Sequence, residues 1–116
     1  MSDGGAGAVV VALVRDLMFG ARVRGAAPEA VIVQRGDRLA EAVGEGTRLV
    51  IVELEGAGAL EAIAAARERA RGARVVGFAP HVREDMLESA RAAGAEVLSR
   101  GAFVKQLPDL VAGAER

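Results

Sequence analysis

The stretch Leu49-Val50-Ile51-Val52, followed by Glu53, decides the fold of this chain. Four large apolar residues in succession are typical of a strand buried on both faces, which indicates a parallel sheet. In open α/β sheets, binding sites form at the carboxyl ends of the strands. Glu53 is therefore expected to place a carboxylate at a functional edge of the sheet.

Four further apolar runs are predicted to be sister strands of residues 49–52, because each is short and mostly β-branched. They span residues 8–14, 30–33, 75–78 and 96–98. The segments between them repeat apolar residues at spacings of three and four, which predicts amphipathic helices. These helices are expected over residues 17–27, 37–43, 60–67, 82–93 and 103–111.

The alternation of strand and helix, at about 20 residues per unit, predicts one parallel sheet with helices on both faces. With right-handed crossovers, the favoured architecture is a single-domain three-layer αβα sandwich with the flavodoxin-like strand order 2-1-3-4-5. Gly44, Gly46, Gly72 and Gly94 follow predicted helices, where left-handed caps favour glycine. We expect residues 1–7 to form a flexible tail and residues 8–116 to form the domain.

Composition excludes several classes of function. The net charge is −1, with 15 basic and 16 acidic residues, which argues against a nucleic-acid or membrane-surface binder. The chain has no Cys and a single His, so thiol chemistry and a zinc cluster are excluded. No apolar stretch is long enough to cross a bilayer and no basic leader begins the chain, so we predict a cytoplasmic protein. We also expect no cofactor.

The second half of the chain resembles the receiver domain of response regulators. Residues 75–84 have the pattern of an apolar strand, a small residue and the start of a helix, and Ala92-Ala93-Gly94-Ala95 matches the turn into the last receiver strand. Residues 49–54 resemble the third receiver strand, and the helix from Phe103 resembles the last receiver helix. The resemblance implies the CheY-like fold and a role in two-component signal transduction.

The functional residues of receivers are only partly present. The acid pair that holds Mg²⁺ corresponds to a region where Asp16 remains and Arg15 stands beside it. The phosphoacceptor Asp corresponds to Glu53, and the Ser or Thr that contacts the phosphoryl group corresponds to Ala79. The Lys at the end of the fifth receiver strand falls on Gly101, or on Arg100 if that strand is one residue shorter.

These departures predict a pseudo-receiver, which keeps the fold without the chemistry. Phosphoryl transfer depends on positioning and charge neutralisation, and Mg²⁺ demands well-placed carboxylates. The extra methylene of Glu53 shifts its carboxylate by about 1 Å, which is enough to impair such a reaction. We therefore expect a non-enzymatic signalling module that acts by protein–protein contact. The alternatives are a genuine phosphoacceptor receiver and a flavodoxin-like domain that binds a small ligand.

Two residues of the degenerate pocket have competing interpretations. Glu53 is either a fixed mimic of the phosphorylated state, with Arg100 as its partner, or a polar residue that finishes a strand at the solvent edge. Asp16 is either a remnant metal ligand or, in the favoured interpretation, the cap of the first helix.

His81 is expected in an exposed turn, and the arginines of residues 67–74 are expected on a solvated face.

The last third of the chain is the predicted interaction surface. Its partner is expected to be another protein, or a second copy bound through the fourth and fifth helices. The residues assigned to this face are Arg83, Met86, Phe103, Lys105 and Leu107. Phe103 has a second interpretation as a core residue, together with Phe19, and Met18 and Met86 are predicted to fill the core.

Overall fold

The central strand β4 (Leu49–Glu53) is buried along its whole length in the computed structural model, which describes residues 7–116. Its side chains alternate between the two faces of the sheet. Val50 and Val52 pack into one hydrophobic cluster, and Leu49 and Ile51 pack into the other. Burial on both faces explains why this strand is a continuous apolar run.

Five parallel strands form one sheet in the order β3-β2-β4-β5-β6, which confirms the predicted order 2-1-3-4-5. The other strands are β2 (Val10–Leu13), β3 (Val31–Val33), β5 (Arg74–Ala79) and β6 (Glu96–Ser99). Each strand and the next one along the chain are joined through a helix, as parallel pairing requires. Strands β3 and β6 lie at the two edges.

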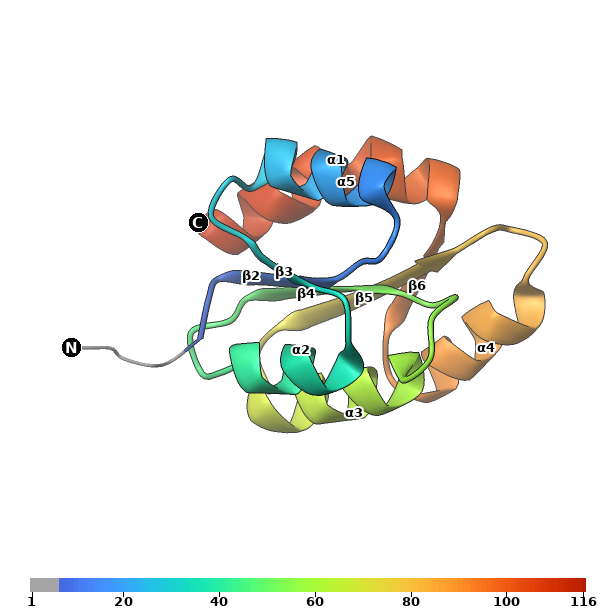
Figure 1. Cartoon of the computed structure of the whole chain (residues 1–116), viewed down its shortest axis with the longest axis horizontal. Coiled ribbons are helices and arrows are strands. Elements are labelled where there is room, and N and C mark those ends of the chain that lie inside the picture. Colours follow the sequence, from blue (N-terminus) through green and yellow to red (C-terminus); the bar gives the residue numbers. More distant parts are fainter. Residues whose placement is uncertain (1–6) are drawn as a thin grey trace.

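The helices cover both faces of the sheet, so the domain is the three-layer αβα sandwich predicted from the sequence. Helices α1 (Leu17–Ala26) and α5 (Arg100–Glu115) lie on one face. Helices α2 (Gly36–Ala42), α3 (Ala59–Arg69) and α4 (Glu84–Ala92) lie on the other (Figure 1). The carboxyl ends of the strands all meet at one edge of the sandwich, where the candidate site lies.

The three phenylalanines of the chain pack together between the sheet and the α1–α5 layer. Phe78 of β5 stacks on Phe103 of α5 with ring centroids 4.2 Å apart and planes 6° apart. Phe19 of α1 lies 5.0 Å from Phe78, centroid to centroid. The prediction that Phe19 and Phe103 are core residues is confirmed, and the cluster fixes α1 and α5 against the sheet.

Three apolar side chains in, or just before, the first turn of a helix are exposed. Val82 precedes α4, which begins only at Glu84, and its side chain is 71% exposed. Met18 lies in the first turn of α1 and is 64% exposed. Leu60 occupies the same position in α3 and is also exposed. The prediction that Met18 fills the core was therefore wrong, whereas Met86 packs against the core.

The glycine caps were predicted correctly at one position out of four. Gly94 has a φ of 101° and follows α4, as expected for a left-handed cap. Gly44, Gly46 and Gly72 are not in the left-handed region, so their predicted role was wrong. The C-caps of α2 and α3 are Val43 and Ala70, whose backbone N–H groups bond within the preceding helix turn.

The predicted tail of residues 1–7 lies almost entirely outside the described residues. Its last member, Gly7, is described and has a φ of 89°. A Cβ atom there would lie 2.5 Å from the backbone nitrogen of Gly44, so the chain passes close to the end of α2. Within residues 7–116, no helix is long and apolar enough to cross a membrane.

Candidate functional site

Glu53 is buried at the end of β4 and faces the β2–α1 connection. Its side chain is 7% exposed, and its Oε1 accepts hydrogen bonds from the backbone N–H of Arg15 at 2.7 Å and of Asp16 at 3.3 Å. The interpretation of Glu53 as a polar residue at a solvent edge was therefore wrong. The glutamate side chain, which is one methylene longer than that of aspartate, reaches the β2–α1 connection. There it provides a hydrogen-bond acceptor for two backbone N–H groups that would otherwise have no acceptor.

Asp16 turns its carboxylate to the first turn of α1. Its Oδ1 accepts hydrogen bonds from the backbone N–H groups of Met18 at 2.8 Å and Phe19 at 3.0 Å. The favoured interpretation of Asp16 as a helix cap is confirmed. The Oδ1 of Asp16 and the Oε1 of Glu53 are thus each engaged by backbone N–H groups.

The Arg15 side chain lies over the loop that follows β4. Its Nη2 donates to the backbone carbonyl of Ala57 at 2.9 Å. A Cβ atom on Gly56 would lie only 1.3 Å from Nη1 of Arg15, so the guanidinium occupies the space that a side chain at residue 56 would need. Arg15, which was expected to lie beside the position that Mg²⁺ occupies in receivers, thus contacts the β4–α3 loop and holds it in place.

Arg100 contacts the same loop through Glu55. Its Nη2 binds the carboxylate of Glu55, and its guanidinium carbon lies 5.6 Å from the centroid of the Phe19 ring. The predicted pair between Arg100 and Glu53 is therefore not formed. Glu55 and Gly56 were not among the predicted site residues, and the short sequence of this loop, Leu54-Glu55-Gly56-Ala57-Gly58, carried no signal for them.

The remaining pocket residues add no reactive group. Ala79 ends β5 with a buried methyl group in the core cluster, so no hydroxyl reaches the pocket. Gly101 lies in the first turn of α5 with open space where its side chain would be. In the described part of the chain, Nη1 of Arg15 and Nε of Arg100 are buried without a hydrogen-bond partner.

The residues present do not fit the Mg²⁺ site of active receivers. Backbone N–H groups donate hydrogen bonds to one carboxylate oxygen of Asp16 and to one of Glu53. Within residues 7–116, no cluster of three or more acids or histidines could hold a metal ion. Mg²⁺ requires near-octahedral oxygen ligation, which these two carboxylates do not offer in this arrangement.

The predicted interaction face is divided by burial. Phe103 and Leu107 are 0% and 3% exposed because they pack against the sheet, so neither is available to a partner. Lys105 is exposed on α5. Arg83 and Met86 line a shallow pocket of about 300 Å³ between the start of α3 and α4. This pocket also includes Leu60 and Ser89.

A crystal structure of a response regulator from Thermotoga maritima is similar to this chain, with a TM-score of 0.68 and 19% sequence identity. The match covers 90% of this chain and 94% of that chain. No protein-family model and no curated protein matches the sequence. At this identity the likeness establishes the fold, so the chain has the CheY-like receiver fold.

Proposed function

We propose that this domain is a pseudo-receiver that signals through protein–protein contacts without accepting a phosphoryl group. The observation that supports this most is the state of Glu53. Its carboxylate accepts hydrogen bonds from the backbone of Arg15 and Asp16, and the side chain is buried. A nucleophile needs an oxygen that a phosphodonor can approach in line.

The groups around Glu53 support the same proposal. Asp16 caps α1, Ala79 carries no hydroxyl and Arg100 binds Glu55. A phosphoryl group in this pocket would lack both the metal and the hydroxyl that neutralise and orient it in receivers. The fold is retained, and its exposed surfaces are the parts through which a chemically inactive domain can act.

Treatment with a small acyl phosphate and Mg²⁺, followed by intact mass measurement, tests the chemical half of the proposal. We expect no phosphoryl adduct on the wild-type protein. A Glu53→Gln variant serves as the control, because it keeps the size of the side chain and removes its nucleophilic charge. A stoichiometric gain in mass on the wild type that is lost in this variant would establish a genuine phosphoacceptor instead.

Partner capture from cell lysate tests the other half. We expect the same proteins to be retained whether the bait is the wild type, the wild type with Mg²⁺ and beryllofluoride, or Glu53→Gln. Retention that requires beryllofluoride would contradict the proposal. A strong rise in the melting temperature with one nucleotide or cofactor would favour the ligand-binding alternative.

A further inference from the structure

Strand β3 is an unpaired edge with an apolar sequence. Val31, Ile32 and Val33 pair with β2 on one side only, and no other described strand lies beyond them. Val31 is 39% exposed, and the other two are partly exposed. In Figure 1 the strand crosses in front of β2, between the α1–α5 layer and α2. Edge strands of this kind are templates for pairing with another strand.

The backbone of β3 directs its free groups outward at Ile32. Val14 donates its backbone N–H to the carbonyl of Val33 at 3.1 Å, so Val33 directs its polar groups toward β2. In a parallel pair, alternate residues direct both N–H and C=O to the same neighbour. Val31 therefore also faces β2, and Ile32 presents its N–H and C=O at the open edge.

An antiparallel pairing of two copies centred on Ile32 satisfies these groups and the side chains together. It places Ile32 opposite Ile32 of the second copy, and Val31 opposite Val33, so every β3 side chain meets a branched apolar one. Glu29 lies in the turn that precedes β3 and Arg35 follows β3, so the same register places these oppositely charged, exposed residues at the same end of the contact, once at each end. A shift by two residues in either direction loses the charge match and places a β3 side chain opposite a polar one, either Val33 opposite Glu29 or Ile32 opposite Gln34.

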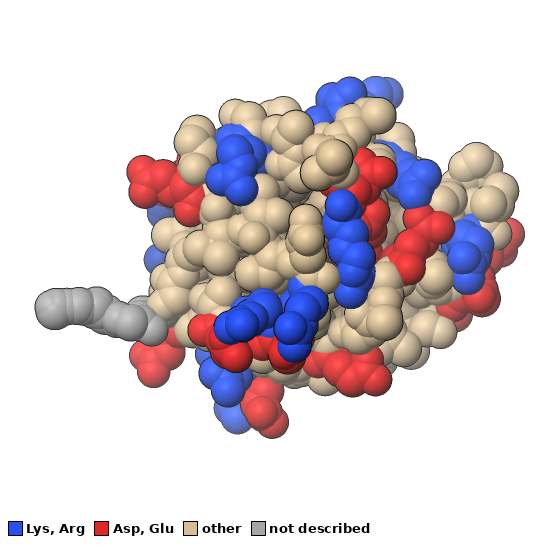
Figure 2. Space-filling view, viewed as in Figure 1, with Lys and Arg blue, Asp and Glu red and all other residues tan. Residues whose placement is uncertain are grey.

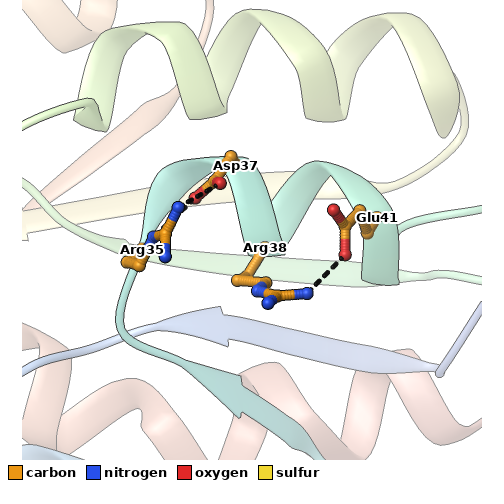
Figure 3. A network of polar contacts seen from close by, with 4 residues as sticks. All are labelled: Arg35, Asp37, Arg38 and Glu41. Atoms are coloured by element: carbon orange, nitrogen blue, oxygen red, sulfur yellow. Dashed lines mark hydrogen bonds and ion pairs between the residues drawn. The ribbon is translucent and has the colours of Figure 1, made fainter.

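The surroundings of β3 favour a second copy of this chain as the partner of the edge. Figure 2 shows an uncharged area at the centre left of this side of the molecule, bordered below by charged side chains over α2 and to the right by further charged side chains. Arg35 binds Asp37 at 2.6 Å with its side chain 69% exposed, so a second carboxylate can reach it (Figure 3). Arg38 is already paired with Glu41 on the same helix. At the other edge of the sheet, β6 begins with Glu96, which is paired with Arg74.

We infer that the β3 edge is a self-association surface, which joins two copies into one continuous sheet through antiparallel pairing centred on Ile32. The contact is independent of the proposed function and lies away from the fourth and fifth helices. Because β3 contributes only three residues, the dimer is expected to be weak and concentration-dependent. It is held by backbone hydrogen bonds, apolar pairs and the two Glu29–Arg35 contacts.

Charge reversal tests the register directly. Glu29→Arg and Arg35→Glu each place like charges together across the two-fold axis, and we expect each to raise the dimer dissociation constant about tenfold in sedimentation equilibrium. When the two variants are mixed, each contact again joins opposite charges, so a heterodimer of wild-type affinity is expected. Both residues are exposed, so the fold is not at risk.

Glu88→Arg and Arg91→Glu, which reverse an exposed pair on α4, are the matched controls. We expect them to leave association unchanged. A monomer at every concentration would overturn the inference and leave the edge to a strand of another protein. A dimer that responds to residues 88 and 91 and ignores residues 29 and 35 would overturn it in favour of the α4 face.

Discussion

The Oε1 of Glu53 and the backbone N–H of Arg15 are joined by a 2.7 Å hydrogen bond at the edge of the sheet where receivers carry out their chemistry. The bond connects the end of β4 to the β2–α1 connection, 38 residues away in the sequence. An acid that the resemblance to receivers places as a nucleophile therefore serves as a structural acceptor.

Removal of the Glu53 side chain is expected to destabilise the domain. Glu53→Ala leaves the N–H groups of Arg15 and Asp16 without their acceptor, at a cost of about 2–3 kcal/mol in the free energy of unfolding. Glu53→Gln keeps an acceptor oxygen and is expected to lose about 1 kcal/mol. Urea denaturation measures both, with Glu68→Ala on the exposed face of α3 as the control. Equal stability of Glu53→Ala and Glu68→Ala would contradict the structural role.

Removal of the Asp16 cap is expected to weaken α1. Asp16→Ala should lower the free energy of unfolding by about 1 kcal/mol. Asp16→Asn should retain most of the stability that the cap contributes, because asparagine also caps helices. The same urea titration, repeated with and without Mg²⁺, separates capping from metal binding. If Mg²⁺ stabilised the wild type and not Asp16→Ala, Asp16 would be a metal ligand after all.

Arg15 and Gly56 are expected to be energetically coupled. Gly56→Ala forces the guanidinium away from the loop and breaks its bond to Ala57, so we expect destabilisation in the wild-type background. In an Arg15→Ala background the same change meets no guanidinium. A double-mutant cycle should therefore give a coupling of about 1 kcal/mol. Additive effects would show that the Arg15 side chain does not occupy this position.

Two glycines are expected to respond in opposite ways to alanine. Gly20 lies inside α1, where an added methyl group would have no neighbour within 4 Å, so Gly20→Ala should stabilise by about 0.5–1 kcal/mol. Gly94 has a φ of 101°, and a Cβ atom there would meet the Arg67 guanidinium at 2.0 Å. Gly94→Ala should therefore destabilise by about 1 kcal/mol or more. Thermal unfolding of the two variants side by side provides the comparison.

The Arg74–Glu96 pair between β5 and β6 is expected to contribute to stability in a pH-dependent way. Its hydrogen bonds from Arg74 lower the pKa of Glu96 below the ordinary value. A lowered acid pKa stabilises the fold at pH values above the unfolded pKa of about 4.3, and the contribution disappears as pH falls through the folded pKa.

Since both side chains are about half exposed, the coupling at neutral pH should be no more than about 1 kcal/mol. A cycle of Arg74→Gln and Glu96→Gln, measured at neutral pH and again in acid, checks both statements. If the coupling persisted at pH values below the pKa of Glu96 in the folded protein, the attraction between the two charges would not be its source.

The sheet could be predicted from the sequence because burial on two faces leaves a distinctive pattern. The apolar runs at β4 and β5 have no other explanation, and their spacing limits the crossovers. Helix ends were less predictable. The predicted helix over residues 82–93 began at Val82, but α4 begins only at Glu84, after its N-cap Arg83, and Val82 is exposed to solvent.

The sequence predicted where the site residues lie in the fold, but it did not predict which residues they contact. Asp16, Glu53 and Ala79 all lie at the carboxyl edge of the sheet, as strand ends must. The partner of Arg100 depends on the path of the loop after β4, which local sequence does not determine. Arg100 pairs with Glu55 rather than Glu53 because Glu53 turns inward to the β2–α1 connection.

The cluster of Phe19, Phe78 and Phe103 gives the protein an unusual optical signature. The chain contains no Trp and no Tyr, so these three rings are its entire aromatic content apart from His81. Near-ultraviolet circular dichroism therefore reports on one corner of the molecule, beneath Arg100 and between α1, β5 and α5. A spectral change on binding a ligand without aromatic groups can be assigned to that corner without labels. A single tryptophan introduced elsewhere would serve as an isolated fluorophore.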